Sequence, residues 1–134
     1  MQKSFKFLVM TPEKDFFNDD VTQVIVCTPD GEMGIMAEHM PMIAVVAESM
    51  LRFEAGGHWK SAAIGKGFLE MISGIAELFV DSAEWAEDID VTRCEAALDR
   101  AQERLHGHLS HSEYLRTHAA VARAKARINA SKRR

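Results

Sequence analysis

Hydrophobic and polar residues alternate along about the first two thirds of the chain. Phe5, Phe7 and Val9 are separated by single residues, the period of two that is expected of a strand with one buried face. Further short runs rich in β-branched, aromatic or Met residues cover residues 21–27, 42–46, 50–54, 59–64, 68–72 and 75–80. This spacing of short strands predicts a β-sandwich or flattened barrel filled by Phe and Met side chains.

Turn-forming residues separate these runs. Thr11-Pro12-Glu13 ends the first run, Asn18-Asp19-Asp20 precedes the second, and Thr28-Pro29-Asp30-Gly31 closes it. Gly56-Gly57 and Ser73-Gly74 lie where tight hairpin turns are expected. We therefore expect the runs on either side of these two dipeptides to pair as hairpins.

The pattern changes to helical spacing after residue 88. Asp90 is a good N-cap, and Gly107 is well placed to end the helix that follows. The apolar stripe of this helix consists of Val91, Cys94, Leu98, Ala101 and Leu105. Ser110 and Glu113 have the spacing of a capping box that opens a second helix. Its expected apolar seam consists of Leu115, Ala119, Ala122, Ala126 and Ala130.

The short connection between the two helices predicts an antiparallel helical hairpin. Each buried CH₂ group contributes about 0.8 kcal/mol, so a seam made mostly of Ala holds less strongly than one made of Leu or Phe. We therefore expect a hairpin that packs closely but can detach.

Composition and charge divide the chain at the same place. Every Phe, Met, Trp and Pro lies before residue 88, whereas the following segment is rich in Ala and Arg. Residues 1–88 hold 6 Lys and Arg against 15 Asp and Glu, and residues 89–134 hold 10 against 5. Such asymmetry indicates two modules with different partners. We assign a β domain to residues 1–87 and a helical hairpin to residues 88–134.

The bulk sequence is typical of a soluble globular protein. No run approaches the roughly 18 apolar residues of a membrane span. The N-terminus enters the alternating pattern directly, so we expect no signal or transit segment. Cys27 and Cys94 lack metal-ligand spacing, which is typical of reduced thiols in a cytosolic protein.

Three short motifs in the sequence are specific enough to suggest a protein family. They are Thr11-Pro12-Glu13, the run Pro-Asp-Gly-Glu-Met-Gly-Ile-Met-Ala-Glu-His-Met-Pro-Met at residues 29–42, and Glu87-Asp88-Ile89-Asp90. Nearly end to end, with this order and spacing, the chain closely resembles the epsilon subunit of F-type ATP synthases of bacterial or plastid type. The resemblance implies a mostly β protein with some α structure, in which a ten-stranded N-terminal sandwich precedes a C-terminal antiparallel helical hairpin.

The resemblance also implies a function. It predicts a non-catalytic central-stalk subunit that couples gamma to the c-ring in proton-driven ATP synthesis and restrains ATP hydrolysis through its hairpin. The implied partners are gamma, the c-ring and the catalytic alpha and beta subunits, without nucleic acid. The expected location is the cytoplasmic face of a bacterial cell membrane, peripheral through the complex, rather than a plastid thylakoid.

Two residues of the central motif match family contact positions. Glu32 matches the acidic residue that faces the polar loops of the c-ring, and His39 matches the histidine at the gamma-facing end of the sandwich. Gly31 and Gly34 are expected to allow a turn that a residue with a Cβ would strain. Considered without the family, a lone His between Glu and Met is usually structural, because a metal site or a catalytic base needs partners.

Arginines on both helices form a second candidate site. Two sets with the spacing of a single helix face are Arg93, Arg100, Arg104 and Arg116, Arg123, Arg127. They fit either two solvated basic faces, partly balanced by Asp99 and Glu103, or a paired stripe that meets polyphosphate or an acidic protein surface. The resemblance implies that Arg116, Arg123 and Arg127 form an inhibitory stripe.

The resemblance further implies a regulatory ATP site, although no cofactor is required. In some bacterial members Ile-Asp, separated by two residues from Arg-Ala, marks ATP binding, and here Cys94 replaces the Ala. The matching positions are Glu84, Ile89, Asp90, Arg93, Arg100, Arg123 and Arg127. We expect no metal site, although His106, His108 and His111 crowd the turn between the helices.

Two other functions fit parts of the sequence. A free-standing nucleotide-sensing module would need the arginines but not a rotary partner, and co-purification with gamma would separate it from a stalk subunit. A metal hydrolase using His39 would hold stoichiometric metal. The sequence lacks a Gly-rich phosphate cradle with Lys, which argues against an enzyme of phosphoryl transfer.

Overall fold

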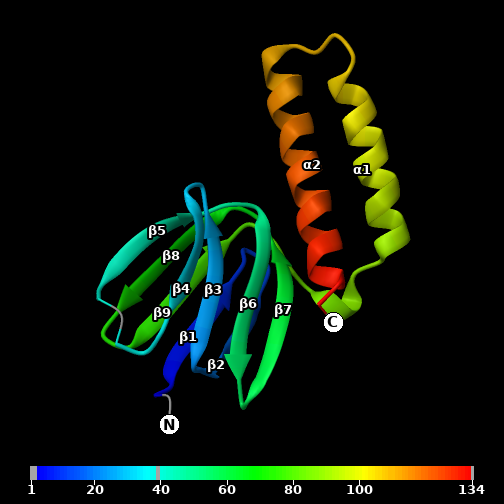
Figure 1. The fold of residues 1–134 in the computed structure, drawn as a ribbon. Helices are drawn as coiled ribbons and strands as arrows, with labels where there is room; N and C mark the ends of the chain where they lie inside the picture. The colour runs from blue at the N-terminus through cyan, green and yellow to red at the C-terminus, as the bar shows by residue number, and fades with distance from the viewer. Residues whose placement is uncertain (1–2, 39, 134) are drawn as a thin grey trace.

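The computed structural model describes residues 3–38 and 40–133, and within them ten strands precede two α-helices (Figure 1). The strands are β1 (Phe5–Met10), β2 (Asp15–Val21), β3 (Gln23–Thr28), β4 (Gly31–Ile35), β5 (Met42–Val46), β6 (Ser49–Ala55), β7 (His58–Ile64), β8 (Gly67–Ile72), β9 (Ile75–Val80) and β10 (Ala83–Trp85). A 3₁₀ turn (Ala86–Asp88), α1 (Val91–Leu105) and α2 (His111–Ser131) follow. The expected sandwich and hairpin are confirmed.

The strands form two five-stranded sheets that face each other. Their orders are β2-β1-β9-β8-β5 and β10-β7-β6-β3-β4, and every recorded pairing is antiparallel except the parallel pair of β1 with β9. Phe7, Phe53, Leu51, Leu69 and Leu78 point into the space between the sheets and are fully buried. The period-two pattern thus lines the core, and Phe side chains fill it as expected.

Two of the turn predictions are confirmed by backbone geometry. Gly56 and Gly57 have φ of 59° and 79°, and Ser73 and Gly74 have φ of 52° and 78°. Positive φ at both central residues matches the right-handed twist of the flanking strands, as in two-residue hairpins. These turns join β6 to β7 and β8 to β9.

Three strands lie where the sequence pattern did not place them. β2 runs through Asn18-Asp19-Asp20, which we had interpreted as a turn. It is an edge strand, so its acidic side chains point to solvent and protect the edge. β4 lies within the motif at residues 29–42, and β10 is a three-residue strand beside β7. Short and polar edge strands carry little hydrophobic periodicity, which explains why they were missed.

Trp85 closes the aromatic cluster of the sandwich. Its ring stacks on Phe16 at a centroid distance of 4.3 Å and lies 6.0 Å from the ring of Phe53. Because this contact comes from the last strand, the β core is complete before the first helix begins.

Both helices begin at the predicted caps. The Asp90 side chain accepts a hydrogen bond from the Arg93 backbone N–H at 3.1 Å. The Ser110 hydroxyl accepts from the Glu113 backbone N–H at 3.2 Å and donates to the Glu113 carboxylate at 2.9 Å. α1 ends at Leu105, directly before the turn that contains Gly107. Local capping chemistry therefore set these boundaries.

The apolar seam predicted for α2 is partly wrong. Ala126 and Ala130 are buried, but Leu115 is 53% exposed. The distal half instead buries Thr117 and Val121, and the Thr117 hydroxyl donates to the Glu113 carbonyl at 2.8 Å. The satisfied hydroxyl can face α1, so the seam is rotated from the position that residue polarity predicted.

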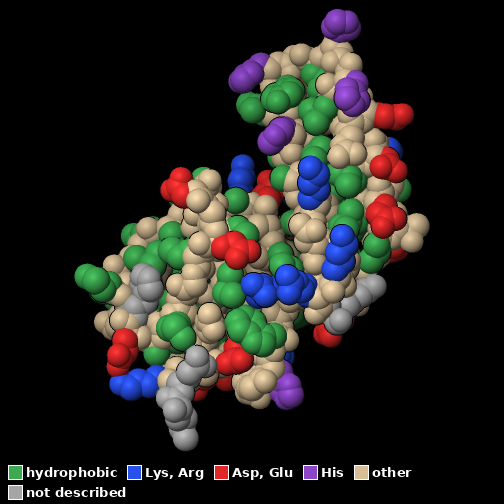
Figure 2. All heavy atoms as spheres, viewed as in Figure 1, with side chains coloured by type: hydrophobic (Ala, Val, Ile, Leu, Met, Phe, Trp, Pro, Cys, Tyr) green, Lys and Arg blue, Asp and Glu red, His purple; other side chains and the backbone are tan. Residues whose placement is uncertain are grey.

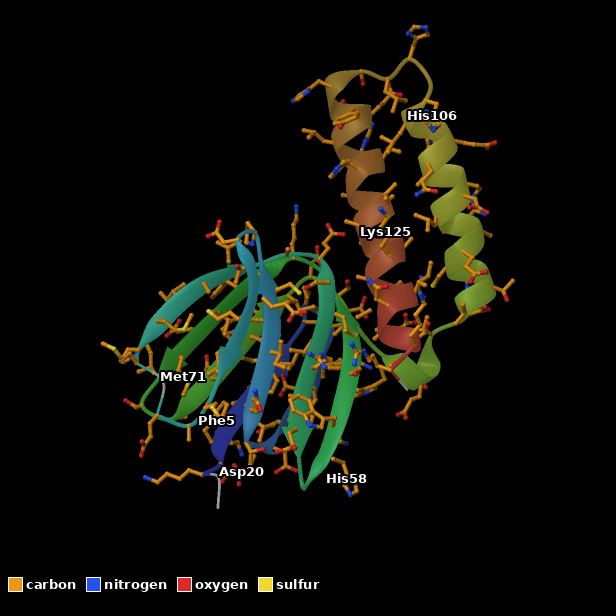
Figure 3. The ribbon with its side chains drawn as sticks, in the orientation of Figure 1. Phe5, Asp20, His58, Met71, His106 and Lys125 are labelled. Atoms are coloured by element: carbon orange, nitrogen blue, oxygen red, sulfur yellow. The ribbon has the colours of Figure 1, made fainter. Side chains whose placement is uncertain are left out.

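The hairpin stands beside one edge of the sandwich. The C-terminal part of α2 packs against β6 and β7, α1 lies on its far side, and the turn between the helices points away from the strands (Figure 1). Figure 3 shows His106 at this distal end and Lys125 on the stretch of α2 nearer the sandwich. The proximal half of the hairpin therefore forms an interface with the sandwich, and the distal half does not.

Candidate functional site

A small apolar cluster holds the base of the hairpin against the sandwich. Its buried members are Ala63, Ala86, Ile89, Cys94 and Ala130, with Met50 and Ile128 packed against them. Burial raises the pKa of the Cys94 thiol, which keeps this group neutral. The cluster contains mostly small side chains, so it buries little apolar area compared with the sandwich core.

An ion pair joins the last strand to α2 beside this cluster. The Arg127 guanidinium donates from Nε to Glu84 Oε1 at 2.8 Å and from Nη2 to Oε2 at 3.2 Å. This hydrogen bonding is the main cause that raises the pKa of Arg127. Both side chains are about one-third exposed, at 36% and 35%, so solvent weakens the pair without removing its fixed geometry.

A cavity of about 470 Å³ lies between the sandwich edge and both helices. It is lined by Ala63, Ile64, Ser82, Ala83, Glu84, Ala97, Ala120, Arg123, Ala124 and Arg127. The Ala-rich sequence of the hairpin leaves this space because its side chains are too short to fill it. Guanidinium groups at its border can bind phosphate or carboxylate oxygens.

A second hollow of about 610 Å³ lies between the two helices. Arg100, Arg104, Arg116 and Arg123 line it, together with Glu113 and several small side chains. Ala97, Ala120 and Arg123 line both spaces, so the basic hollow adjoins the cavity. On the face shown in Figure 2, Lys and Arg side chains gather where the hairpin meets the sandwich.

The residues expected to bind ATP fall into two groups. Glu84, Arg123 and Arg127 line the cavity, and Arg100 lines the adjoining hollow. Ile89, Asp90 and Arg93 lie at the start of α1 instead, where Ile89 is buried and Asp90 caps the helix. They border neither of these spaces. The structure thus gathers four of the seven positions around adjoining hollows. The other three lie at residues 89–93, the junction of the sandwich and α1, called here the hinge.

Comparison with known proteins assigns the family. A family model described as ATP synthase, Delta/Epsilon chain, beta-sandwich domain matches residues 4–86, and one described as the long alpha-helix domain matches residues 87–132. The ATP synthase epsilon chain of Ruminiclostridium cellulolyticum is 40% identical over 131 residues, 98% of each chain. The chain belongs to the ATP synthase epsilon chain family. The resemblance that the motifs suggested is confirmed.

Other epsilon chains and two structures agree in fold. The epsilon chain of Caldanaerobacter subterraneus is 37% identical over 129 residues, 96% of this chain and 94% of that one. A chain in the structure of the Euglena gracilis mitochondrial ATP synthase has a TM-score of 0.83 at 20% identity, covering 92% of this chain and 78% of that one. A chain in the Tetrahymena thermophila mitochondrial ATP synthase central stalk and c-ring structure has a TM-score of 0.66 at 13% identity, covering 97% and 98%.

One of the two expected contact residues, Glu32, lies in β4. Glu32 is exposed on this strand and pairs in register with Cys27 of β3. His39 lies outside the described residues. Gly31 has a φ of 128°, as expected at a turn, but Gly34 sits within the strand and a Cβ there would meet nothing closer than 4.0 Å. The expectation that a Cβ at Gly34 would cause strain was therefore wrong.

Exposed apolar side chains stand on β5, β8 and β9 around the outward-facing Glu70 and Glu77, and the sequence analysis did not identify them. These side chains, called here the apolar face, are Ile43, Val45, Phe68, Ile72 and Ile75, which are 42–72% exposed. Val45 pairs with Phe68 and Ile72 pairs with Ile75 across the strands. Such side chains at outward positions could have been recognised once the register was known. An apolar patch of this kind indicates an interaction site.

Sequence reasoning also missed Glu48. It lies in the turn between β5 and β6, and its Oε2 is 3.8 Å from Nη1 of Arg123. A single acidic residue between two strands looks like an ordinary solvent-facing residue in the sequence. Only the packing of α2 over this turn makes it part of the interface.

Neither a metal centre nor a membrane-spanning helix occurs in the described part of the chain. Among residues 3–38 and 40–133, His, Cys, Asp and Glu form no group of three or more that could hold a metal ion. No helix within the same ranges is long and apolar enough to cross a membrane. His side chains gather at the hairpin tip in Figure 2, where the rings of Tyr114 and His118 lie 5.9 Å apart.

Proposed function

We propose that this chain is a non-catalytic rotor subunit of an F-type ATP synthase central stalk, which couples gamma to the c-ring during proton-driven ATP synthesis. The observation that carries the proposal is similarity over 98% of the chain to a curated ATP synthase epsilon chain. The two similar structures support it, because they are of ATP synthase assemblies that contain a c-ring, one of them with the central stalk. The chain then acts at the cytoplasmic face of a bacterial membrane, held there by the complex.

The apolar face is the surface that we assign to gamma. Coupling requires a contact that transmits torque without slipping, and apolar side chains on a rigid sheet suit such a contact. Phe68 is supported by its neighbour on β9, because its ring stacks on that of Phe79, its cross-strand partner, at 5.0 Å. Glu32 is assigned to the c-ring, and His39 to the gamma-facing end.

The hairpin is assigned as a restraint on ATP hydrolysis. Its basic stripe, Arg116, Arg123 and Arg127, suits the acidic surfaces of the alpha and beta subunits. In the docked pose Arg127 is hydrogen-bonded to Glu84 and Arg123 lies beside Glu48, so two of the three arginines are drawn toward the sandwich rather than toward a partner. Restraint therefore requires the hairpin to leave the sandwich, and a ligand shifts this equilibrium only by binding one pose better.

The charge of the stripe can be tested in the assembled enzyme. Replacing Arg116, Arg123 and Arg127 together by Ala should raise the ATP hydrolysis rate at least about threefold, since exposed ion pairs contribute about 0.2–1 kcal/mol each. The same three positions changed to Lys keep the charge and should retain most of the restraint. Salt should mimic the Ala variant, because exposed charges are screened over about 8–10 Å. Unchanged hydrolysis in the Ala variant would leave the stripe a solvated surface.

A regulatory ATP site is proposed at the cavity and hinge. The residues assigned to it are Glu84, Ile89, Asp90, Arg93, Arg100, Arg123 and Arg127. Calorimetry on the isolated subunit should give a Kd below millimolar, which Arg93→Ala and Arg127→Ala each weaken at least about tenfold by removing charged hydrogen-bond donors. Arg52→Ala, on the sandwich over Trp59, is the matched control and should bind normally. Absence of heat at millimolar ATP would refute the site.

The cavity also favours a second candidate, a free-standing nucleotide-sensing module. The two functions differ in their partners. A stalk subunit co-purifies with gamma from the native membrane, and it is lost from the membrane fraction when the complex is dissociated. A free-standing sensor would bind ATP but remain apart from gamma.

A further inference from the structure

Two acidic residues of the sandwich face two arginines one turn apart on α2, but the two pairs differ in kind. Glu84 accepts two hydrogen bonds from Arg127, with both side chains partly open to solvent. Glu48 lies 3.8 Å from Arg123, too far for a hydrogen bond. The first pair is a well-formed contact, and the second is an approach of charges without a bond.

Glu48 is partly buried, and one of its two carboxylate oxygens, Oε2, has no hydrogen-bond partner among the described residues. Its side chain is 10% exposed. The neighbouring Ser49 hydroxyl donates to the Ala47 carbonyl at 2.6 Å rather than to Glu48. A buried carboxylate oxygen that accepts no hydrogen bond opposes the structure that buries it.

Charged groups from three elements act on Glu48. Arg123 comes from α2, Asp81 from the turn after β9, and Lys66 from the turn after β7. Burial has the largest effect and raises the pKa of Glu48, and Asp81 adds to this rise. Arg123 and Lys66 act in the opposite direction but do not reverse it. Removal from water thus outweighs the attraction of the ion pair.

We propose that Glu48 is a release element, which in its ionised form drives the hairpin away from the sandwich while Glu84 holds the hairpin in place. The proposal rests on the hairpin mobility in the proposed function. The two acid–arginine pairs would therefore act in opposite directions: the Glu84–Arg127 pair stabilises the docked hairpin, and ionised Glu48 destabilises it. This opposition explains how an interface with a bidentate ion pair can remain easy to open.

The sign of the pH effect follows from linkage. The docked state, in which Glu48 has the raised pKa, binds the proton more tightly than the undocked state, in which the carboxyl returns toward its ordinary value. Protonation therefore favours docking. This contribution is complete below the ordinary pKa of a carboxyl group and is lost as pH rises through the raised pKa.

Cys94 provides a built-in reporter of undocking. It is fully buried in the cluster at the hairpin base and loses the cover of Ala63 and Ala86 when the hairpin leaves the sandwich. With Cys27→Ser as background, Cys94 is the single thiol of the full chain. The rate of its reaction with a maleimide then measures the undocked population, after division by the rate in unfolded chain at the same pH.

The substitutions have opposite expected effects at pH 8. Glu48→Gln should slow Cys94 labelling at least about threefold, because a neutral amide is less costly to bury than a carboxylate. Glu84→Gln should accelerate labelling by a similar factor through loss of the charged bidentate pair. Glu13→Gln removes the same charge at an exposed position before β2, so Cys94 in this variant should react at the background rate. The normalised background rate should fall as pH falls from 8 to 5, and this fall should be much smaller in Glu48→Gln.

The opposite result is equally clear. If Glu48→Gln labels at the background rate, Glu48 has no effect on docking. If it labels faster, as Glu84→Gln should, Glu48 stabilises the docked hairpin. Either result would overturn the proposal. Urea unfolding of each variant excludes a change in global stability as the cause. Because the assay uses the isolated subunit, its outcome is independent of whether the hairpin restrains hydrolysis in the assembled enzyme.

Discussion

Replacing Val45 and Phe68 together by Asp should abolish binding of the subunit to gamma. Both side chains are exposed on the apolar face and are paired across β5 and β8. Two carboxylates added beside Glu70 and Glu77 must be desolvated when gamma covers the sheet, and the apolar contact is lost at the same time. Central interface residues often contribute 2 kcal/mol or more, so two should weaken binding by at least about 100-fold.

The matched control places an Asp on the opposite sheet. Trp59 is 48% exposed on β7, and Trp59→Asp should leave gamma binding within a few-fold of the parent chain. Affinity is measured on immobilised gamma, with urea unfolding to show that each variant is folded. Normal binding of the double variant, or loss of binding in Trp59→Asp, would place the gamma contact elsewhere.

Ending the chain after Glu87 should produce a folded sandwich that still assembles but no longer restrains hydrolysis. The aromatic cluster is complete at Trp85, and both sheets are built from strands that precede the cut. Ala63 and part of Met50 lose cover when the hairpin is removed, so stability should fall by no more than about 1–2 kcal/mol.

The truncation also tests the division at residues 87 and 88, which remains a prediction. Urea unfolding should give a single cooperative transition, and reconstitution should restore gamma binding and coupled ATP synthesis. The ATP hydrolysis rate should rise at least as much as in the triple Arg→Ala variant. An unfolded fragment, or one that fails to bind gamma, would mean that the hairpin is part of the sandwich fold.

Local sequence signals predicted most of the fold. Gly56-Gly57 required a tight turn, and Asp90 and Ser110 fixed the starts of both helices through capping hydrogen bonds. These features depend on only a few neighbouring residues. β2 and β4 were missed because their alternation is weak, and Leu115 was misplaced because the helix contacts, not its polarity, decide which side is covered.

The candidate site was less accessible to sequence reasoning. The arginines were found because their spacing repeats on each helix, but their acidic partners come from elements far away in the chain. Glu84 was named through the family, whereas Glu48 became visible only when α2 was seen to cover its turn. The apolar face likewise required the strand register, since its residues come from three separate strands.

The central claim is that the hairpin must leave the sandwich to restrain ATP hydrolysis. Ala83→Cys and Ala120→Cys place thiols on opposite walls of the cavity without touching the basic stripe, in a chain whose own Cys27 and Cys94 are replaced by Ser and Ala. A short bismaleimide then locks the docked pose. The decisive measurement is the ATP hydrolysis rate of the reconstituted enzyme before and after cross-linking. The account predicts that the locked subunit gives the fast rate of the hairpin-deleted enzyme, and a locked enzyme that stays as restrained as the unlocked one would contradict it.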